Sequence, residues 1–141
     1  MKENFCPVAD YFDKVVSVIV FSDGNAQTFE KGDPAYEAIL KSWGELLAEA
    51  RQMPAFGVSI DSLTREEMKK GLWVEFIFDG KQMCENMPFE SLLAAVKAPY
   101  RGLNIVRNCG GMYQGRCFYI DLGEKDMSAF EAALMKTIAN K

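Results

Sequence analysis

The chain has 141 residues, 49% of them hydrophobic, and 16 Lys and Arg against 20 Asp and Glu give a net charge of −4. A chain of this length buries enough surface for one self-sufficient core, so we expect a single domain over residues 1–141. The complete absence of histidine excludes Ser-His-Asp and Cys-His nucleophile pairs and His-ligated metals, and the acidic balance opposes nucleic-acid binding.

The first third of the chain predicts a hairpin followed by a helix. A β-branched run from Val15 to Phe21 predicts a strand, and Asp23-Gly24 is a dipeptide typical of a tight hairpin turn into a second strand over residues 26–30. Asp33 and Pro34 are the residue types of an N-cap and a first helical position. Apolar residues at helical spacing then predict a helix to about residue 51.

The middle third predicts short elements around one long strand. Residues 55–60 suit a short strand, and Thr64 to Glu67 has the pattern of a capping box that opens a brief helix. Residues 72–79 alternate between an apolar and a mixed face, which predicts a strand with one buried face. Asp79-Gly80 predicts a second hairpin turn into a short strand over residues 81–84.

A short helix is predicted after Pro88. Its apolar side would carry residues 89, 92, 93 and 96, and the restriction on the residue before Pro99 would end it. The last third predicts a strand, a Gly-rich connection over residues 110–115, a second strand, and a final helix capped by Asp126.

The pairing of the last two strands has two possible registers. The preferred register places aliphatic residues on one face by pairing Leu103 with Leu122, Ile105 with Ile120, Arg107 with Phe118 and Cys109 with Arg116. A slip of one residue would set Cys109 opposite Cys117 and favour a disulfide under oxidising conditions. The sequence alone leaves both registers open.

These elements alternate hairpins with helices that have one apolar stripe. Hairpins connect antiparallel neighbours. We therefore expect an α+β domain of two layers, in which helices pack on one face of a mainly antiparallel sheet. Whether residues 1–12 pack on this domain is left open by the sequence.

The expected cellular location and the expected lack of a cofactor rest on the targeting segments, membrane spans and cysteine motifs of the sequence. No segment has the pattern of a signal peptide or a membrane span. The four cysteines, Cys6, Cys84, Cys109 and Cys117, are widely spread and include no C-x-x-C pair. We expect reduced thiols in a cytoplasmic protein, with no metal site and no cofactor.

One segment is locally basic. Residues 97–117 hold Arg101, Arg107 and Arg116 together with Cys109, beside a pair of glycines. Guanidinium groups and free backbone N–H groups can bind a carboxylate or phosphate, and positive charges favour a thiolate. The simpler interpretation is that these arginines face solvent at a sheet edge and that the glycines satisfy a turn.

Three functional hypotheses follow. The first is a non-catalytic interaction or regulatory domain that binds a protein partner or forms a homodimer, with Trp73 and Ile77 on the second, partly apolar strand face as candidate interface residues. The second is a domain that binds a small anionic ligand through the basic segment 97–117. The third is a cysteine-dependent enzyme, in which Cys109 would need a base other than histidine. The sequence favours the first.

Overall fold

The protein is described by a computed structural model that covers residues 6–54, 57–113 and 115–139. The helices are η1 (Pro7–Lys14, a 3₁₀ helix), α1 (Pro34–Leu47), α2 (Asp61–Glu67) and α3 (Ser128–Ala139). The strands are β1 (Val15–Ser22), β2 (Asn25–Glu30), β3 (Arg51–Met53), β4 (Val58–Ser59), β5 (Leu72–Cys84), β6 (Met87–Val96), β7 (Gly102–Cys109), β8 (Met112–Tyr113), β9 (Gly115–Arg116) and β10 (Phe118–Asp121).

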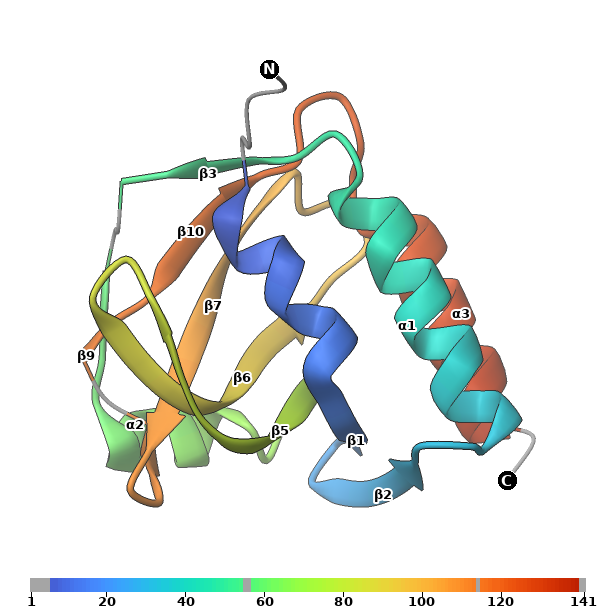
Figure 1. The fold of residues 1–141 in the computed structure, drawn as a ribbon. Helices are drawn as coiled ribbons and strands as arrows, with labels where there is room; N and C mark the ends of the chain where they lie inside the picture. The colour runs from blue at the N-terminus through green and yellow to red at the C-terminus, as the bar shows by residue number, and fades with distance from the viewer. Residues whose placement is uncertain (1–5, 55–56, 114, 140–141) are drawn as a thin grey trace.

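The strands form one large antiparallel sheet and one small one. The large sheet has eight strands in the order β2-β1-β5-β6-β7-β10-β3, with β8 paired to β7 outside this path, and β4 pairs with β9 in a two-stranded sheet. The helices α1 and α3 lie side by side, and η1 crosses in front of the sheet (Figure 1). The α+β class expected from the sequence is confirmed.

The main core lies between the large sheet and the helices η1, α1 and α3. It is rich in aromatic side chains, and the Trp43 ring on α1 lies 5.4 Å from Phe12 of η1 and 5.1 Å from Phe130 of α3, centroid to centroid. Val8 and Phe12 are both buried, so η1 is part of this core. Edge-to-face and tilted ring pairs of this kind add to the area they bury.

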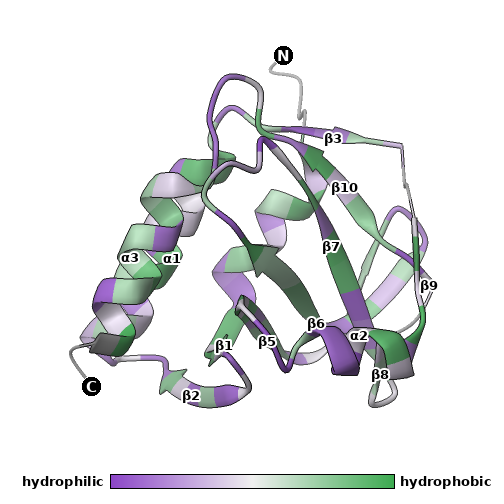
Figure 2. Cartoon of the chain, turned by 180° about the vertical axis from the view of Figure 1, so that it is seen from behind, coloured by the Kyte–Doolittle hydropathy of each residue, from purple (hydrophilic) through white to green (hydrophobic). Residues whose placement is uncertain are grey.

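A second, smaller cluster lies on the opposite face of the sheet. Met68, at the end of α2, packs there with Leu93, Val106, Tyr113 and Cys117. Because this cluster brings α2 to the second face, the expected packing of all helices on one face of a two-layer domain is not confirmed. Figure 2 shows α2 together with β8 at one end of the molecule, away from α1 and α3.

The first hairpin and the start of α1 are confirmed as predicted from local sequence signals, but α1 ends at Leu47 rather than near residue 51, where β3 begins. Asp23 and Gly24 adopt φ values of 48° and 88° in the turn between β1 and β2, where Ser22 pairs with Asn25. Asp33 caps α1 by accepting a hydrogen bond from Ala35 N at 2.9 Å, and Pro34 begins the helix. A two-residue turn with positive φ at both positions matches the twist of the strands it joins.

The region from residue 79 to residue 96 corrects two predictions. Residues 87–96 form strand β6 rather than a helix, because β6 is buried on both faces and therefore has apolar residues at positions that mimic helical spacing. The turn lies at Glu85 and Asn86, with φ values of 52° and 65°, and not at Asp79-Gly80. Gly80, at φ 96°, instead lies in an irregularity where the register of β5 against β6 shifts.

Helix α2 begins earlier than the capping-box pattern predicted. Its N-cap position is occupied by Ile60, which makes no capping hydrogen bond with its side chain. Thr64 is buried inside the helix, where its Oγ1 lies 2.7 Å from Ser59 Oγ. Thr64 therefore fixes α2 against β4 instead of opening the helix.

Both predicted registers of the last strand pair were wrong. Ile105 pairs with Phe118 and Leu103 with Ile120, two residues away from the preferred register, which keeps the same residues on the core face. Gly110 and Gly111 form a two-residue turn with φ values of 67° and 82°, so Cys109 pairs with Met112 of β8 rather than with Cys117. The chain then pairs with β4 through β9 before it returns to the large sheet as β10.

Candidate functional site

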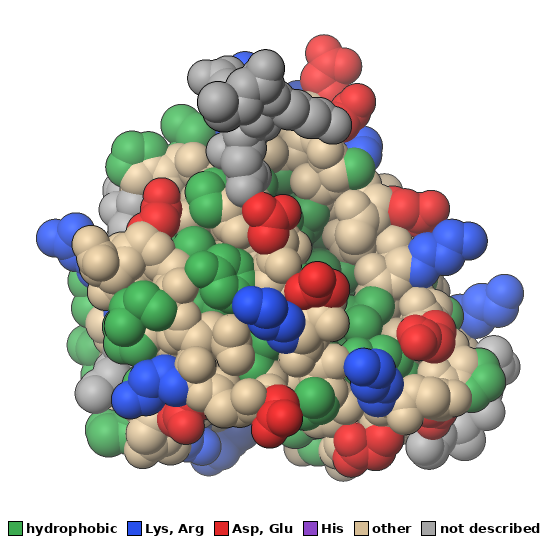
Figure 3. All heavy atoms as spheres, viewed as in Figure 1, with side chains coloured by type: hydrophobic (Ala, Val, Ile, Leu, Met, Phe, Trp, Pro, Cys, Tyr) green, Lys and Arg blue, Asp and Glu red, His purple; other side chains and the backbone are tan. Residues whose placement is uncertain are grey.

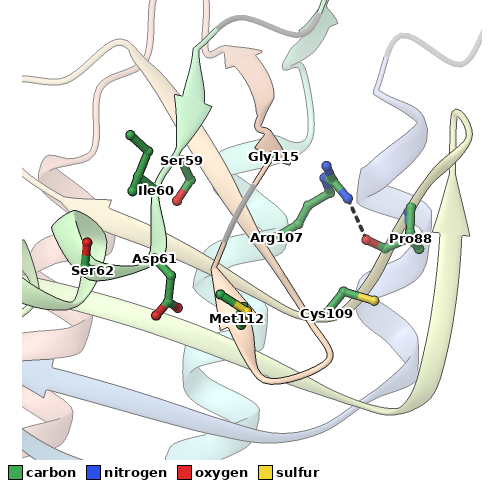
Figure 4. Close-up of a pocket in the computed structure, with 9 residues that line it drawn as sticks. All are labelled: Ser59, Ile60, Asp61, Ser62, Pro88, Arg107, Cys109, Met112 and Gly115. Carbon is green, nitrogen blue, oxygen red and sulfur yellow. Dashed lines mark hydrogen bonds between the residues drawn. The ribbon is translucent and has the colours of Figure 1, made fainter.

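A broad pocket of about 810 Å³ opens between the start of α2 and the β7–β8 hairpin. Its volume falls within the range of small-molecule binding pockets. The residues that line it come from four parts of the chain and are shown in Figure 4: Ser59, Ile60, Asp61, Ser62, Pro88, Arg107, Cys109, Met112 and Gly115. Most of the wall is apolar, with one carboxylate and one guanidinium.

The guanidinium of Arg107 is held by two backbone carbonyl groups. Its Nε donates to Arg116 O at 2.7 Å and its Nη1 donates to Pro88 O at 2.8 Å, a bond drawn in Figure 4. A Cβ built on Gly115 would lie 2.7 Å from Arg107 Nη2, so only glycine leaves room for the guanidinium in this position. Arg107 thus ties β7 to β6 and β9 at the pocket.

Asp61, the carboxylate that lines the pocket, accepts hydrogen bonds from Arg65 and Tyr113. Arg65 Nε donates to both Asp61 oxygens at 3.0 Å, and the backbone N–H of Tyr113 donates to Oδ1 at 2.8 Å. These bonds lower the pKa of Asp61, the bond from Tyr113 most of all. Arg65 also lies 4.8 Å from the centre of the Tyr113 ring and donates to Gly111 O at 2.8 Å, which fixes α2 to β8.

A buried acid lies in the sheet beneath Tyr113. Glu75 is only 4% exposed, and its two oxygens accept hydrogen bonds from Tyr113 OH at 2.7 Å and Ser91 Oγ at 2.6 Å. Burial raises the pKa of Glu75 above its ordinary value, while these two hydrogen bonds oppose the change. Glu75 belongs to the strand face that the sequence predicts as mixed, and its burial was not predicted. The available signal was an acid in the middle of an apolar strand.

The structure gathers only part of the predicted basic site. Arg107 and Cys109 lie on one strand and line the same pocket. Arg116 is an exposed neighbour on β9, where it pairs with Val58. Arg101 lies before the other end of β7, where its Nε and Nη2 donate to Gly123 O at 3.2 and 3.0 Å. Arg101 and Arg107 are six positions apart along the extended chain, a span of roughly 20 Å.

Cys109 is accessible enough to react. Within the described part of the chain, however, no side chain is placed as a general base for its thiol. Its side chain is partly exposed in the pocket. The carboxylate of Glu90, on the neighbouring strand β6, accepts a hydrogen bond from Gly110 N at 2.7 Å. The hypothesis of cysteine-dependent catalysis gains no support from this geometry, because a cysteine nucleophile needs an adjacent base or another source of thiolate stabilisation.

The candidate interface residues Trp73 and Ile77 are both partly buried. The Trp73 indole donates to Lys70 O at 2.9 Å and packs against the second cluster. Trp73 also lines a second pocket of about 420 Å³, which shares Ser59 with the first pocket. The segment from β4 to α2 therefore lies between two pockets.

Large apolar side chains are exposed along this segment and on the adjacent hairpin. Val58 is 70% exposed, Ile60 56%, Leu63 58% and Met112 44%. We call these four residues the apolar rim. Figure 3, which views the molecule as Figure 1 does, shows basic and acidic side chains interspersed rather than separated into fields of one sign. Exposed apolar side chains that neighbour one another, rather than single ones, mark interaction sites.

No protein-family model, curated protein or solved structure matches this chain. Within residues 6–54, 57–113 and 115–139, no group of three or more Cys, Asp and Glu side chains is placed to hold a metal ion. In the same part of the chain, none of the helices has the length and apolar character needed to cross a membrane.

Proposed function

We propose that this chain is a non-catalytic interaction domain that binds a partner polypeptide on the apolar rim. The observation that supports the proposal is the exposure of the four rim side chains, 44–70%, two of which, Ile60 and Met112, line a pocket that can receive a side chain. Exposed apolar surface of this kind lowers its free energy when a partner covers it. Cys84, Cys109 and Cys117 form no disulfide, and we propose a cytoplasmic setting on the basis of these three reduced thiols.

The arrangement favours a polypeptide over a small molecule. Ile60 and Met112 line the larger pocket, but Val58 and Leu63 do not. A ligand confined to that pocket would leave Val58 and Leu63 in water. An extended segment of a partner that placed one apolar side chain in the pocket would cover the whole rim, in the way that partner peptides use anchoring side chains.

The first experiment is selection of binding peptides from a random library displayed on phage, followed by affinity measurements by fluorescence anisotropy. We expect the selected peptides to be apolar, and we expect Ile60→Ser and Val58→Ser to weaken their binding by about tenfold each, the order expected when one aliphatic side chain loses its contacts. Met135→Ser is the matched control, because Met135 is 47% exposed on α3, away from the rim. It should leave the affinity unchanged.

Three results would change this proposal. Peptides that bind both rim variants as tightly as the wild type, or a selection that yields no binding peptide, would contradict it. A dimer in analytical ultracentrifugation that Ile60→Ser dissociates would instead assign the rim to a second copy of the chain. Ile60→Ser is a favourable test variant because Ser is preferred at the N-cap position that Ile60 occupies, so lost binding would not reflect an unfolded helix.

A further inference from the structure

The charge of Arg107 has no acidic partner in the described part of the chain. Its two hydrogen-bond acceptors, Arg116 O and Pro88 O, are carbonyl oxygens. The two ion pairs near the pocket and on α2, Arg65 with Asp61 and Lys69 with Glu66, do not involve Arg107. Carbonyl groups orient a guanidinium without neutralising it, so the positive charge remains available to a ligand.

The acids near the pocket are already bound by other donors. Asp61 is paired with Arg65 and accepts from Tyr113 N. Glu90 accepts from Gly110 N at 2.7 Å. Glu90 keeps its charge but does not line the pocket, and Asp61 is paired with Arg65. Among the residues that line the pocket, Arg107 is therefore the charged group without an ion-pair partner in the described part of the chain. A ligand that fits this pocket by charge therefore carries a negative group.

The geometry of the guanidinium leaves a donor free to bind such a group. Nε and Nη1 are used by the two carbonyls, while Nη2 donates to no acceptor among the described residues. Nη2 faces Gly115, which has no side chain to cover it and a φ of 90° that disfavours any replacement. Arg107 is half-buried, so its position is fixed and its charge is screened less than that of an exposed arginine.

We propose that Arg107 is a carboxylate-binding subsite of the pocket, and that the ligand joins this carboxylate to an apolar group which packs on Ile60, Pro88 and Met112. This inference rests on the proposed function, because it assigns the chemistry of the partner segment that enters the pocket. The partner presents an apolar residue with a carboxylate beside it, from an Asp or Glu side chain or from its own C-terminus.

Arg101 is the matched control, because it is an arginine whose hydrogen bonds are structural and which lies outside the pocket. Like Arg107, it donates to a backbone carbonyl, but it is exposed and lies near the far end of β7, outside the pocket. A substitution of either arginine removes one positive charge and bonds to carbonyl oxygen. Only the substitution of Arg107 should change the affinity of the pocket for an anion.

The test uses 4-phenylbutyrate and its neutral analogue 4-phenylbutanamide as probes, titrated into the ¹⁵N-labelled protein at pH 7 and low salt. We expect the carboxylate to bind about tenfold more tightly than the amide, equivalent to ~1.4 kcal/mol, and to shift the Arg107 Nε–H signal. The preference should decrease as salt is added, because ions screen the charge. Arg107→Gln should abolish the preference, whereas Arg101→Gln should retain it.

The subsite is overturned if the wild type binds both probes equally, if neither probe binds, or if Arg101→Gln loses the preference as Arg107→Gln does. Arg107→Gln also loses bonds that join three strands. If it fails to fold, the wild-type comparison of the two probes and the response of the Arg107 signal still decide the question. Arg107→Lys, which keeps the charge, should then fold and retain part of the preference.

Failure of the subsite is distinguishable from failure of the proposed function. If peptides bind the rim but acidic and neutral versions bind equally, the interaction domain stands and the carboxylate subsite is wrong. If 4-phenylbutyrate binds through Arg107 but no peptide binds the rim, the pocket takes a small anionic ligand instead. Peptides ending in a free carboxylate, compared with the same peptides ending in an amide, distinguish a C-terminus from an acidic side chain.

Discussion

Tyr113 donates its phenolic hydroxyl to Glu75 at 2.7 Å, while its backbone N–H donates to Asp61 at 2.8 Å. A single residue of β8 therefore connects an acid buried in the sheet with the carboxylate on the pocket wall. This contact also places Glu75 under the surface that we propose as a binding site. Because Glu75 is buried, its protonation should affect the stability of the protein.

We predict that the contribution of Glu75 to the free energy of unfolding decreases as the pH rises above the ordinary Glu pKa of 4.5. Burial raises the pKa of Glu75 in the folded protein. As the pH rises, the unfolded chain loses this proton first, so the stability associated with the protonated acid is present below 4.5 and is lost as the pH approaches and passes the raised folded pKa. Glu75→Gln keeps the shape and removes this titration.

Urea unfolding of both proteins from pH 4 to pH 8 measures the effect. The variant should become more stable than the wild type as the pH increases, and its profile should lack the Glu75 contribution. Glu49→Gln, at an exposed acid of the α1 C-terminal region, should leave the wild-type profile unchanged. A constant difference between Glu75→Gln and the wild type across this range would show that Glu75 has the same pKa in both states.

The turn at Glu85 and Asn86 predicts a stabilising double substitution. Both residues have positive φ, which is costly for glutamate and is the conformation that Asn-Gly adopts most readily in a two-residue hairpin. Glu85→Asn with Asn86→Gly should increase the free energy of unfolding by about 0.5–1 kcal/mol, even though the exposed bond from Gln52 Nε2 to Glu85 is lost. Urea unfolding provides the measurement.

Gly80 provides the opposing substitution on the same pair of strands. A Cβ at this position would meet no atom within 4 Å, but its φ of 96° strains any other residue. Gly80→Ala should therefore destabilise the protein by about 1 kcal/mol or more. A neutral Gly80→Ala would contradict the positive φ of Gly80, and a destabilising double substitution at 85 and 86 would contradict a turn at those two residues.

The turns of the sheet show which features of the fold could be predicted from the sequence and which could not. Asp23-Gly24 and Asp79-Gly80 carry the same turn signal, yet only the first forms a turn, because β5 continues through residue 80 to pair with β6. Local signals also located α1 through its cap. They could not separate strand β6 from a helix, since burial on both faces is decided by neighbouring strands and a register that the local pattern does not contain.

The site was predictable to a similar extent. Arg107 and Cys109 are two residues apart on a strand, so they share a face and reach the same pocket. Arg101 belongs to the same basic segment, but the length of β7 separates it from them. The wall formed by Ile60 and Asp61 depends on how α2 packs on β8, through contacts about 50 residues apart in the sequence. No local pattern encodes that packing.

Ile60 predicts a substitution that strengthens the fold while it removes a rim residue. Ile60 has the extended backbone conformation of an N-cap but offers no side-chain acceptor to the free N–H groups of α2. Ile60→Ser should stabilise the protein by about 0.5–1 kcal/mol, because its 56% exposed side chain contributes little burial. Leu63→Ser, also on the rim but inside the helix, has no capping role and should not stabilise it. Urea midpoints of the two variants separate these effects.

The four thiols should differ widely in their rate of alkylation. Cys6, Cys84 and Cys117 are buried, and burial raises the pKa of each, to about 11 for Cys84. A thiol reacts as its thiolate and only when the reagent reaches it, so these three should be protected until the protein unfolds. Cys109 is partly exposed in the pocket and should react first.

Intact mass spectrometry after a short treatment with iodoacetamide at pH 7.5 should show one added group, and Cys109→Ser should show none. If two or more thiols are modified at the same rate in the folded wild type, the second cluster around Cys117 or the packing of Cys6 and Cys84 in the main core opens much more often than the burial of these residues implies.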